Sequence, residues 1–519
     1  MFAPLPGAVN VSGTVQYEKT IYSRPPANVP EAVAYAPLAG AAIRAYDPVG
    51  NLAATAETDK NGFYTLRADA SAVRVEVASS SAYVAVGSGF SSGNTTGLYS
   101  LEVTPLTGSA LGRDLIILRS SNAGAFNIFT QLTRGRGWLL ERGYGLDSGI
   151  RAVWPSSSTQ FVPGEGKLYI QLQHRDGDPD EFDDDIILHE FGHLFAELFS
   201  TDHSEGGSHS ITGTLDLRLS WSEGFAHWFS SAVRSDPVHV DSTGSVNSTG
   251  ASLVSSFDIS KPAAQALGAG NEWAVAHVLW KARESFGEAG VLAAAARFRT
   301  VPAALQGDPV TLDSFHDVFP VVSPGADLSA VYLDRRMSYS LDALEPAVPP
   351  VTVAVSANLP YTRDALTFFP ANDRDSFRFS ALKGETYDIE TGKTGNGALT
   401  ELRVYLGEGG PLIASNAQRF GASSDTTSYV FLSAGVDGDY FVEVLRFTSA
   451  TRNYGPDGGS YTRTAGHYGS YAVAVSRAPT ASADPSRSAI PGFKPELPAL
   501  RQSSTADGDK GRCWLQSFP

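Results

Sequence analysis

Short strand patterns occupy both ends of this 519-residue chain and enclose a central stretch with helical periodicity. A period of two residues predicts strands, whereas recurrence at three and four residues predicts helices, so one uniform fold cannot accommodate the whole chain. A single hydrophobic core also stops growing beyond about 300 residues. We therefore predict a multidomain protein with an N-terminal β-sandwich over residues 1–117, a central α+β domain over 118–346, a C-terminal β-sandwich over 351–478 and a disordered tail over 479–519.

The strand predictions depend on short apolar runs that lie between turn residues. In the N-terminal part, valines alternate with charged residues over 73–77, and Asn61-Gly62 predicts a tight hairpin because both residues tolerate positive φ angles. Seven similar runs follow a proline-rich joint at residues 347–350. The tail is rich in Ser, Pro and Ala and shows no periodicity, which is typical of disorder.

The composition restricts the class of protein and its partners. Apolar residues make up 42% of the chain and charged residues only 18%, so disorder over most of the chain is not expected. The net charge of −16 would repel phosphates, which argues against a nucleic-acid partner. Cys513 is the only cysteine, which excludes an internal disulfide and a multi-thiolate zinc site.

No run of 18 apolar residues predicts a membrane span, and the N-terminus lacks the basic and apolar regions of a secretory signal.

The string HEFGH at positions 189–193 carries the clearest chemistry. Residues four apart lie on one face of a helix, so His189 and His193 can bind one metal ion together. Glu190 lies beside them, where its carboxylate can accept a proton from an attacking water. The motif stands inside an amphipathic pattern that begins with aspartates, which suit the positive end of a helix. The alternative is a pair of buried structural histidines with a surface glutamate.

A catalytic zinc site needs a third protein ligand and keeps one position open for water. The candidate is Glu223, a carboxylate 30 residues beyond His193 near the start of a helical pattern in WSEGFAHWF. The alternative is a carboxylate that only stabilises the helix start. His227 follows Glu223 by four residues and shares its face, so it either hydrogen-bonds to a ligand or is a buried polar residue without a catalytic role.

Other polar residues could complete the site. His209 lies in the glycine-rich loop EGGSHS, from which it could stabilise the oxyanion of a tetrahedral intermediate, and with Glu190 it is our second candidate catalytic residue. The alternative for His209, as for His203, is an exposed loop histidine. Asp216 could orient a zinc-binding histidine or cap a turn. Four further residues could hold the oxyanion, and nothing in the sequence selects among them: Tyr332, Tyr339, His277 and His316.

The acidic run DGDPDEFDDD at residues 176–185 could bind a second metal ion. Calcium prefers several carboxylate oxygens, but the spacing of this run differs from that of an EF-hand loop. The run therefore predicts either a calcium site or a solvated loop that leads into the helix.

Three groups of motifs resemble known families. HEFGH followed by SEGFA resembles the gluzincin peptidases, which implies a zincin-like central domain with one catalytic zinc on His189, His193 and Glu223 and with the strand KLYIQLQ at a sheet edge for an extended peptide. SGTV, GAAIRAYD and TDKNGFYTL resemble the transthyretin-like, carboxypeptidase-regulatory-like domain. NDRDSFRFSALKGETYDIE and GVDGDYFVEV resemble the bacterial pre-peptidase C-terminal domain, a jelly-roll-like sandwich that commonly trails secreted peptidases.

Together the resemblances imply an extracellular or cell-envelope zinc metallopeptidase that acts on a protein or peptide substrate, with β domains that could contact a cell surface or polysaccharide. We expect an endopeptidase, because no acidic anchor for a free amino terminus is identifiable. An adhesin-like protein with structural zinc and a zinc hydrolase of a non-peptide substrate are the alternatives. The presence of Glu190 argues against the first alternative, because a structural zinc site does not need a base.

Overall fold

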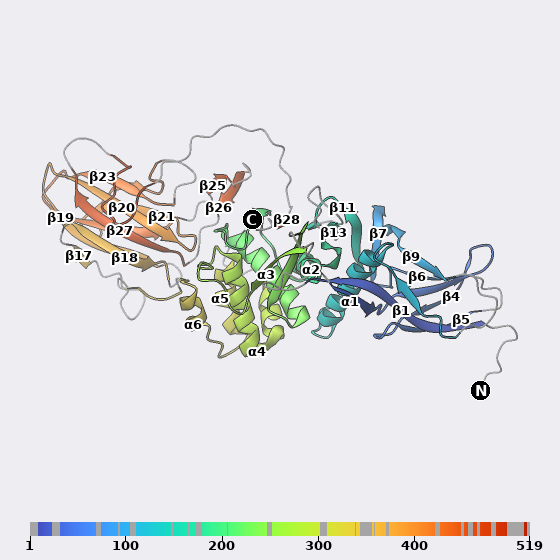
Figure 1. The fold of residues 1–519 in the computed structure, drawn as a ribbon. Helices are drawn as coiled ribbons and strands as arrows, with labels where there is room; N and C mark the ends of the chain where they lie inside the picture. Colours follow the sequence, from blue (N-terminus) through green and yellow to red (C-terminus); the bar gives the residue numbers. More distant parts are fainter. Residues whose placement is uncertain are drawn as a thin grey trace. The chain divides into compact units, whose positions relative to one another are not determined.

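The computed structural model describes a strand-rich, multidomain protein with several sheets and few helices (Figure 1). Its contacts divide the chain into two compact units, residues 1–200, 225–261 and 511–519 in the first and residues 201–224 and 262–510 in the second, and the division falls inside helix α3 (Leu217–Arg234). The described residues are 9–22, 32–68, 74–91, 94–103, 111–146, 149–162, 167–171, 179–204, 206–246, 252–300, 309–337, 339–342, 355–357, 359–369, 373–420, 426–447, 451–454, 460–463, 468–478, 484–495 and 513–515.

Some sequence predictions rest on residues 1–8, 176–178 and 347–350, which lie outside the described residues. Within the described part, no helix combines the length and the apolar character that crossing a membrane requires.

The N-terminal strands of the first unit form two sheets. Strand β1 (Val9–Ile21) pairs with β2 (Ala32–Pro37), β5 (Phe63–Ala68) and β10 (Leu115–Ile117). The second sheet has the order β4 (Leu52–Glu57), β3 (Ala42–Tyr46), β6 (Arg74–Ala78) and β9 (Ser100–Val103). Burial alternates along β1, β3, β5 and β6, as the period of two predicts, so that one face of each sheet is apolar.

The turn at Asp59–Gly62 differs from the prediction. Gly62 has the positive φ of 78° that a tight turn needs, and Asp59 Oδ1 accepts hydrogen bonds from the N–H groups of Asn61 and Phe63. The flanking strands do not pair, because β4 pairs with β3 while β5 pairs with β1. The hairpin prediction is therefore wrong, and the turn carries the chain from one sheet to the other.

A mixed sheet follows, with the order β12 (Gln160–Val162), β13 (Lys167–Gln171), β11 (Ile150–Ser156), β7 (Val84–Ser91) and β8 (Asn94–Leu98). Strands from both sides of residue 117 share this sheet, so the boundary predicted there does not separate two sheets. Strand β13, predicted at an edge, lies between β12 and β11, and the edge strand is β12. Helices α1 (Ala123–Leu140) and α2 (Asp184–Phe199) pack against this sheet and against each other.

The rest of the first unit surrounds α2. The short helix η1 (Asp180–Phe182) precedes it, and the hairpin of β15 (Val238–Val246) and β16 (Ser252–Asp258) follows α3. Gly192 lets α2 approach α3 closely, because a Cβ atom there would lie 3.0 Å from the Cα atom of Ala226.

The second unit contains β14 (Gly207–His209), α4 (Glu272–Thr300), α5 (Leu312–Val322) and α6 (Ser329–Asp334). Helix α4 consists of two helical segments that meet at a kink at Gly287, which has a non-helical φ of 79°. Helix α3 begins at Leu217, so Glu223 lies in its second turn. Apolar side chains of α3, α4 and α5 meet where Trp221 packs against Phe298 and Phe315.

The C-terminal part of this unit is a β-sandwich, and all seven predicted strands are present in it. One sheet has the order β17 (Val355–Ala357), β19 (Arg374–Ala381), β24 (Gly438–Arg446), β21 (Thr400–Leu406) and β22 (Leu412–Asn416). The other has the order β18 (Tyr361–Thr367), β27 (Ser470–Arg477), β20 (Thr386–Gly395) and β23 (Tyr429–Ser433).

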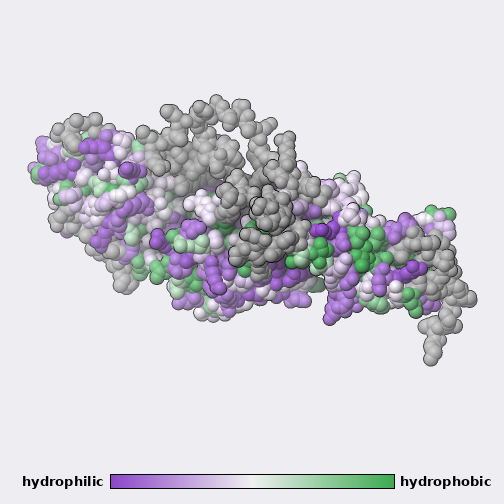
Figure 2. All heavy atoms as spheres, in the orientation of Figure 1, coloured by the Kyte–Doolittle hydropathy of each residue, from purple (hydrophilic) through white to green (hydrophobic). Residues whose placement is uncertain are grey.

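Both sheets of the sandwich contribute to one apolar core, in which Phe377, Val404 and Val442 of one sheet meet Ile389 and Val473 of the other. Hydrophilic residues are prominent on the face of the sandwich that Figure 2 shows. Two further pieces are the hairpin of β25 (Thr451–Tyr454) and β26 (Ser460–Arg463), and strand β28 (Cys513–Leu515).

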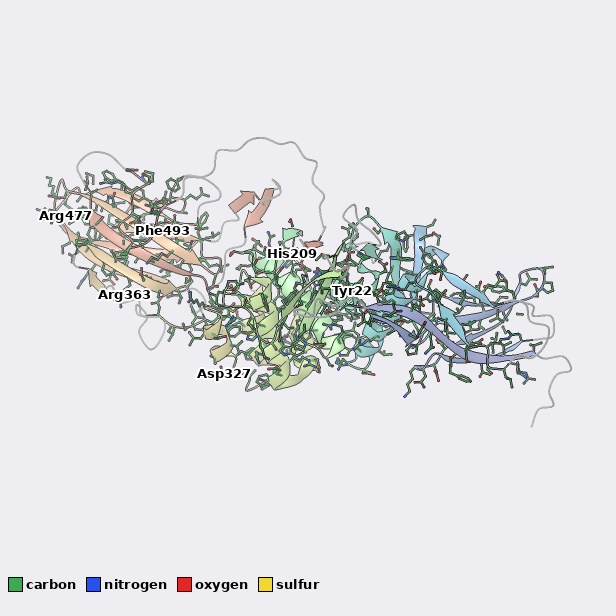
Figure 3. The ribbon with its side chains drawn as sticks, in the orientation of Figure 1. Tyr22, His209, Asp327, Arg363, Arg477 and Phe493 are labelled. Carbon is green, nitrogen blue, oxygen red and sulfur yellow. The ribbon has the colours of Figure 1, made fainter. Side chains whose placement is uncertain are left out.

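The predicted disordered tail is wrong for residues 484–495, which lie against the sandwich. Ile490 is 2% exposed and packs with Phe493 against Ala472 and Ala474 of β27. Figure 3 labels Phe493 at this place. The segment lacks periodicity because it docks as an irregular stretch, so its few apolar residues gave no regular pattern to detect.

Candidate metal centre

Helix α2 places the two histidines of HEFGH on one buried face. Asp184 and Asp185 lie in its first turn, where the helix dipole favours negative charge. Apolar side chains of the same helix are buried around the motif, and His189 is fully buried while His193 is 8% exposed. Glu190 is 1% exposed, so the predicted alternative of a surface glutamate is wrong.

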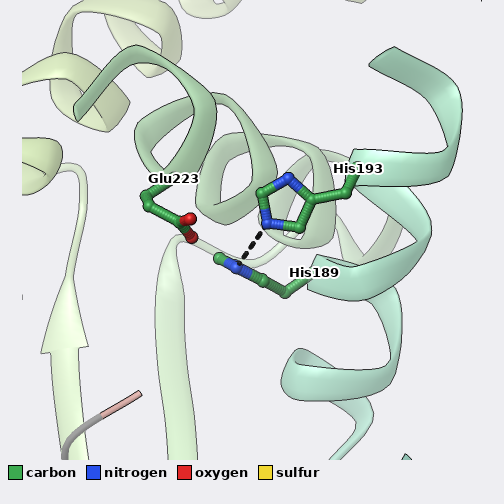
Figure 4. Close-up of side chains that lie close together, drawn as sticks. All are labelled: His189, His193 and Glu223. Atoms are coloured by element: carbon green, nitrogen blue, oxygen red, sulfur yellow. Dashed lines mark hydrogen bonds between the residues drawn. The ribbon is translucent and has the colours of Figure 1, made fainter. Parts of the chain in front are cut away.

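His189, His193 and Glu223 come together as a group that could hold a metal ion, with one donor atom from each within 4.8 Å of the others (Figure 4). The two Nε2 atoms of the histidines lie 3.2 Å apart. Two ligands on a tetrahedral zinc ion with bonds of about 2.0–2.1 Å lie about 3.3 Å apart, so this distance fits a shared ion. The donor set of two imidazoles and a carboxylate is also the set that catalytic zinc uses.

Helix α3 fixes Glu223 through contacts on both sides of it. Ser222 Oγ donates a hydrogen bond to Asp202 Oδ2 at 2.5 Å. Gly224 brings α4 close, because a Cβ atom there would lie only 2.6 Å from the Cβ atom of Val275. Glu223 is 2% exposed. A carboxylate in this position is neither at the first turn of the helix nor in solvent, so stabilising the helix start does not account for it.

His227 lies next to His189, with 3.2 Å between their Nδ1 atoms. Since Nε2 of His189 faces His193, the Nδ1 contact places His227 behind the ligand, where an outer hydrogen bond orients a metal-bound ring. His239 of β15 continues the line: its ring lies 4.8 Å from that of His227, and its Nδ1 lies 3.4 Å from Asp185 Oδ1. Burial, followed by the charges of His189 and Arg234, holds the pKa of His239 well below its ordinary value.

His209 is 3% exposed, so the alternative of an exposed loop histidine is wrong for it. Its Nδ1 lies 2.8 Å from Oε2 of Glu272, at the first residue of α4, and its Nε2 lies 3.5 Å from Oε2 of Glu223. Burial raises the pKa of Glu272; His209 counteracts this rise and Glu223 adds to it. Both ring nitrogens of His209 thus face carboxylates.

A second acidic group lies before α2. Asp180, Asp183 and Asp241 each offer an oxygen within 4.8 Å of the others. Asp183 is 2% exposed and accepts hydrogen bonds from the N–H and Oγ of Ser242 through Oδ2. Burial, with the nearby Asp241 and Asp180, raises the pKa of Asp183 well above its ordinary value. The predicted run thus supplies Asp180 and Asp183, while Asp241 comes from β15.

The remaining candidates lie as follows. His203 is exposed, and its Nδ1 accepts a hydrogen bond from the N–H of Val310. Asp216 Oδ1 accepts hydrogen bonds from the N–H and Nε of Arg218, which fits the turn role. His277 is buried in α4. The other three of the four possible oxyanion residues gather in one cluster, where Tyr339 donates to Asp313 and its ring contacts those of His316 and Tyr332.

Sequence reasoning missed Glu272 and His239. Glu272 is fully buried at the start of a helix whose next residues, WAVAHVLW, are mostly apolar, and an acid in such a place is unusual. His239 lies inside the alternating run Val238–Val240, which marks it only as a strand residue. The first signal could have been noticed, whereas the second carried no information about a partner.

Residues 148–285 match the family model described as the Mycolysin C-terminal domain. This stretch contains His189, His193 and Glu223 but covers less than half of the chain. No curated protein matches the sequence.

Among solved structures, the pre-peptidase C-terminal domain of a collagenase from Bacillus anthracis is similar over 24% of this chain and 94% of that chain, at 14% identity and a TM-score of 0.17. PliG, a periplasmic lysozyme inhibitor from Aeromonas hydrophila, is similar over 24% of this chain and 95% of that chain, at 15% identity and a TM-score of 0.15. TM-scores this low do not assign a fold.

Proposed function

We propose that this protein is a zinc-dependent peptidase whose metal binds to His189, His193 and Glu223. The proposal depends on one observation: two imidazoles and a carboxylate are buried with one donor atom from each within 4.8 Å of the others, and Glu190 follows the first ligand in the sequence. The match to the Mycolysin C-terminal domain supports it, because mycolysin is a zinc protease and the matched residues include all three ligands. When bound, zinc would polarise the scissile carbonyl and make water a stronger nucleophile.

The side chains divide the remaining work. Glu190 would remove a proton from the attacking water and deliver it to the leaving amine. His227 would orient the ring of His189, and burial of the group would exclude competing water. We propose that the protein is an endopeptidase that cleaves protein or peptide substrates in an extracellular or cell-envelope location. The C-terminal sandwich would be a pre-peptidase-like domain. The β domains would contact a cell surface or a polysaccharide.

The test compares variants of the full chain in casein cleavage and in bound zinc. We expect a chelator to abolish cleavage, Glu190→Gln to lower the turnover at least about 100-fold with zinc retained, and His193→Ala to lose both. Glu141→Gln, an exposed acid at the end of α1, is the control and should cleave normally. Normal cleavage by Glu190→Gln would show that the assigned base is wrong, and bound zinc without any hydrolysis would favour the structural-zinc alternative.

We also propose a calcium ion at Asp180, Asp183 and Asp241. Besides the clustering of the three carboxylates, Asp183 Oδ1 is buried and has no hydrogen-bond partner among the residues that the structure describes. The Asp183 side chain makes no capping hydrogen bond at the start of α2, although Asp is a favoured residue there. A hard cation would satisfy this oxygen and offset the repulsion among the carboxylates.

A further inference from the structure

Behind Glu223 lies a buried arrangement of two carboxylates with an imidazole between them. The ring of His209 faces Glu272 through Nδ1 at 2.8 Å and Glu223 through Nε2 at 3.5 Å. The side chains of His209 and Glu272 have no exposed surface, and that of Glu223 is 2% exposed. Figure 3 labels His209, the last residue of β14. Burying two carboxylates without a partner costs several kcal/mol, and the imidazole between them offsets part of this cost.

We propose that Glu272 and His209 are positioning residues that act in series on the third metal ligand: Glu272 fixes the ring of His209, and His209 fixes the carboxylate of Glu223. This inference rests on the proposed zinc site and assigns a role to Glu272, which no sequence motif marks. The two ring nitrogens of His209 point to different carboxylates, so one imidazole links Glu272 to Glu223.

The geometry separates this role from two others. His209 does not belong to the group whose donor atoms all lie within 4.8 Å of one another, so the described residues do not place it as a fourth ligand. An oxyanion donor would need a ring nitrogen directed at the substrate, whereas both nitrogens of His209 face carboxylates. The remaining role is to hold Glu223 in one orientation, which reduces the entropy lost when the ion binds.

The backbone supports the same relationship. Gly224 follows Glu223 directly, and a Cβ atom there would lie 2.8 Å from the carbonyl oxygen of Glu272. The start of α4 therefore lies against α3 at the position of the ligand. Glu272 stands in the first turn of α4, where the helix dipole favours its charge. Strand β14 brings His209 to the same place, so three elements meet behind the ligand.

The experiment is a double-mutant cycle on the full chain, read as zinc affinity by competition with a chromophoric chelator. We expect His209→Ala and Glu272→Ala each to lower the affinity about 10–100-fold. The double variant should lie within about twofold of His209→Ala, because Glu272 acts only through His209. Glu284→Gln, an exposed acid of α4 that pairs with Lys281, is the control and should bind zinc as the wild type does.

Circular dichroism and thermal unfolding without metal show whether each variant folds. If Glu272→Ala does not fold, Glu272→Gln replaces it in the test. Glutamine keeps the size of the side chain and one hydrogen-bond acceptor but loses the charge, so we expect the zinc affinity to fall about fivefold. A merely structural role would lower thermal stability and leave the zinc affinity of the folded fraction unchanged.

Two results would overturn the inference: folded Glu272 and His209 variants with wild-type affinity, or single losses that multiply in the double variant. The zinc affinity of His193→Ala shows whether only the positioning role is wrong or the metal site itself is wrong. If His193→Ala also binds zinc as the wild type does, the metal group itself is wrong and both proposals fall. If the variants behave as expected but casein is not cleaved, the positioning role stands and only the peptidase proposal fails.

Discussion

His239 occupies the inner end of a line of buried imidazoles that begins at His189. Its ring stacks on Phe257 at 4.7 Å, and Arg234 already pairs with the neighbouring Asp185. A proton on His239 would therefore add a positive charge beside Arg234 without a free counter-charge, which agrees with its lowered pKa.

This shift gives the stability a pH dependence. The unfolded His239 takes up a proton near pH 6.5, whereas the folded residue stays neutral, so stability present above pH 6.5 is lost as the pH falls below it. We expect the metal-free protein to lose up to about 1.4 kcal/mol per pH unit from this residue. His239→Phe should show a shallower dependence in denaturant titrations from pH 8 to 5.5. Equal slopes for the variant and the wild type would show that His239 does not contribute.

At the same scale, the three metal-binding residues and the base were predictable because they lie in two local strings. His189, Glu190 and His193 occupy five consecutive positions, and Glu223 follows in a helix with a familiar string. Glu272 lies 49 residues farther along, and its relation to Glu223 depends on how α4 packs against α3. That packing depends on Gly224 and Val275 meeting in space, which no local pattern expresses.

At the scale of elements, the approach of α3 to α4 depends on the missing side chain of Gly224. With Gly224→Ala, the new Cβ would lie 2.6 Å from the Cβ of Val275, so the helices must separate. We expect a loss of about 1–3 kcal/mol in unfolding free energy, together with weaker zinc binding because Glu223 moves. Gly137→Ala in α1 is the control, since no heavy atom lies within 4 Å of its Cβ position, and it should stabilise by up to about 1 kcal/mol. Equal stability for both variants would contradict the close packing.

The acidic group before α2 joins the start of that helix to β15. Calcium bound to Asp180, Asp183 and Asp241 would therefore hold two elements together, and we expect millimolar calcium to raise the unfolding temperature by several degrees, which corresponds to about 1–2 kcal/mol. Asp183→Asn and Asp241→Asn should abolish the calcium response and keep zinc binding. Asp327→Asn, an exposed acid, should respond as the wild type does. A calcium response that survives in both variants would rule out this site.

The elements themselves were predictable to the extent that their patterns are local. Alternation marked β6, short apolar runs marked the seven strands of the C-terminal sandwich, and amphipathic spacing marked α2. Pairing was not predictable: Asn61-Gly62 has the residues of a hairpin, yet β5 pairs with β1 because the long β1 offers it a partner in another sheet. Likewise, β7 pairs with β11 across the predicted domain boundary.

At the scale of the whole molecule, the segment 484–495 extends the C-terminal sandwich beyond its last strand. Arg419 is 4% exposed, pairs with the buried Glu390 at 2.7 Å and donates from Nε to the carbonyl oxygen of Pro485 at 2.6 Å. Ser488 Oγ donates to Glu390 as well. One buried ion pair thus links β20 to a segment that no periodicity marks.

Arg419→Met tests this link. The variant keeps an apolar stem of similar length but leaves Glu390 buried without its counter-charge, so we expect a loss of about 3–5 kcal/mol in unfolding free energy. The segment should also become accessible to protease near Arg487, because Arg419 Nη2 no longer donates to the carbonyl oxygen of Arg487. Arg403→Met, whose pair with Glu401 is partly exposed, should lose less than about 1 kcal/mol. Denaturant titration and limited proteolysis compare the two variants. If Arg419→Met is as stable and as resistant to protease as Arg403→Met, the segment docks through Ile490 and Phe493 alone.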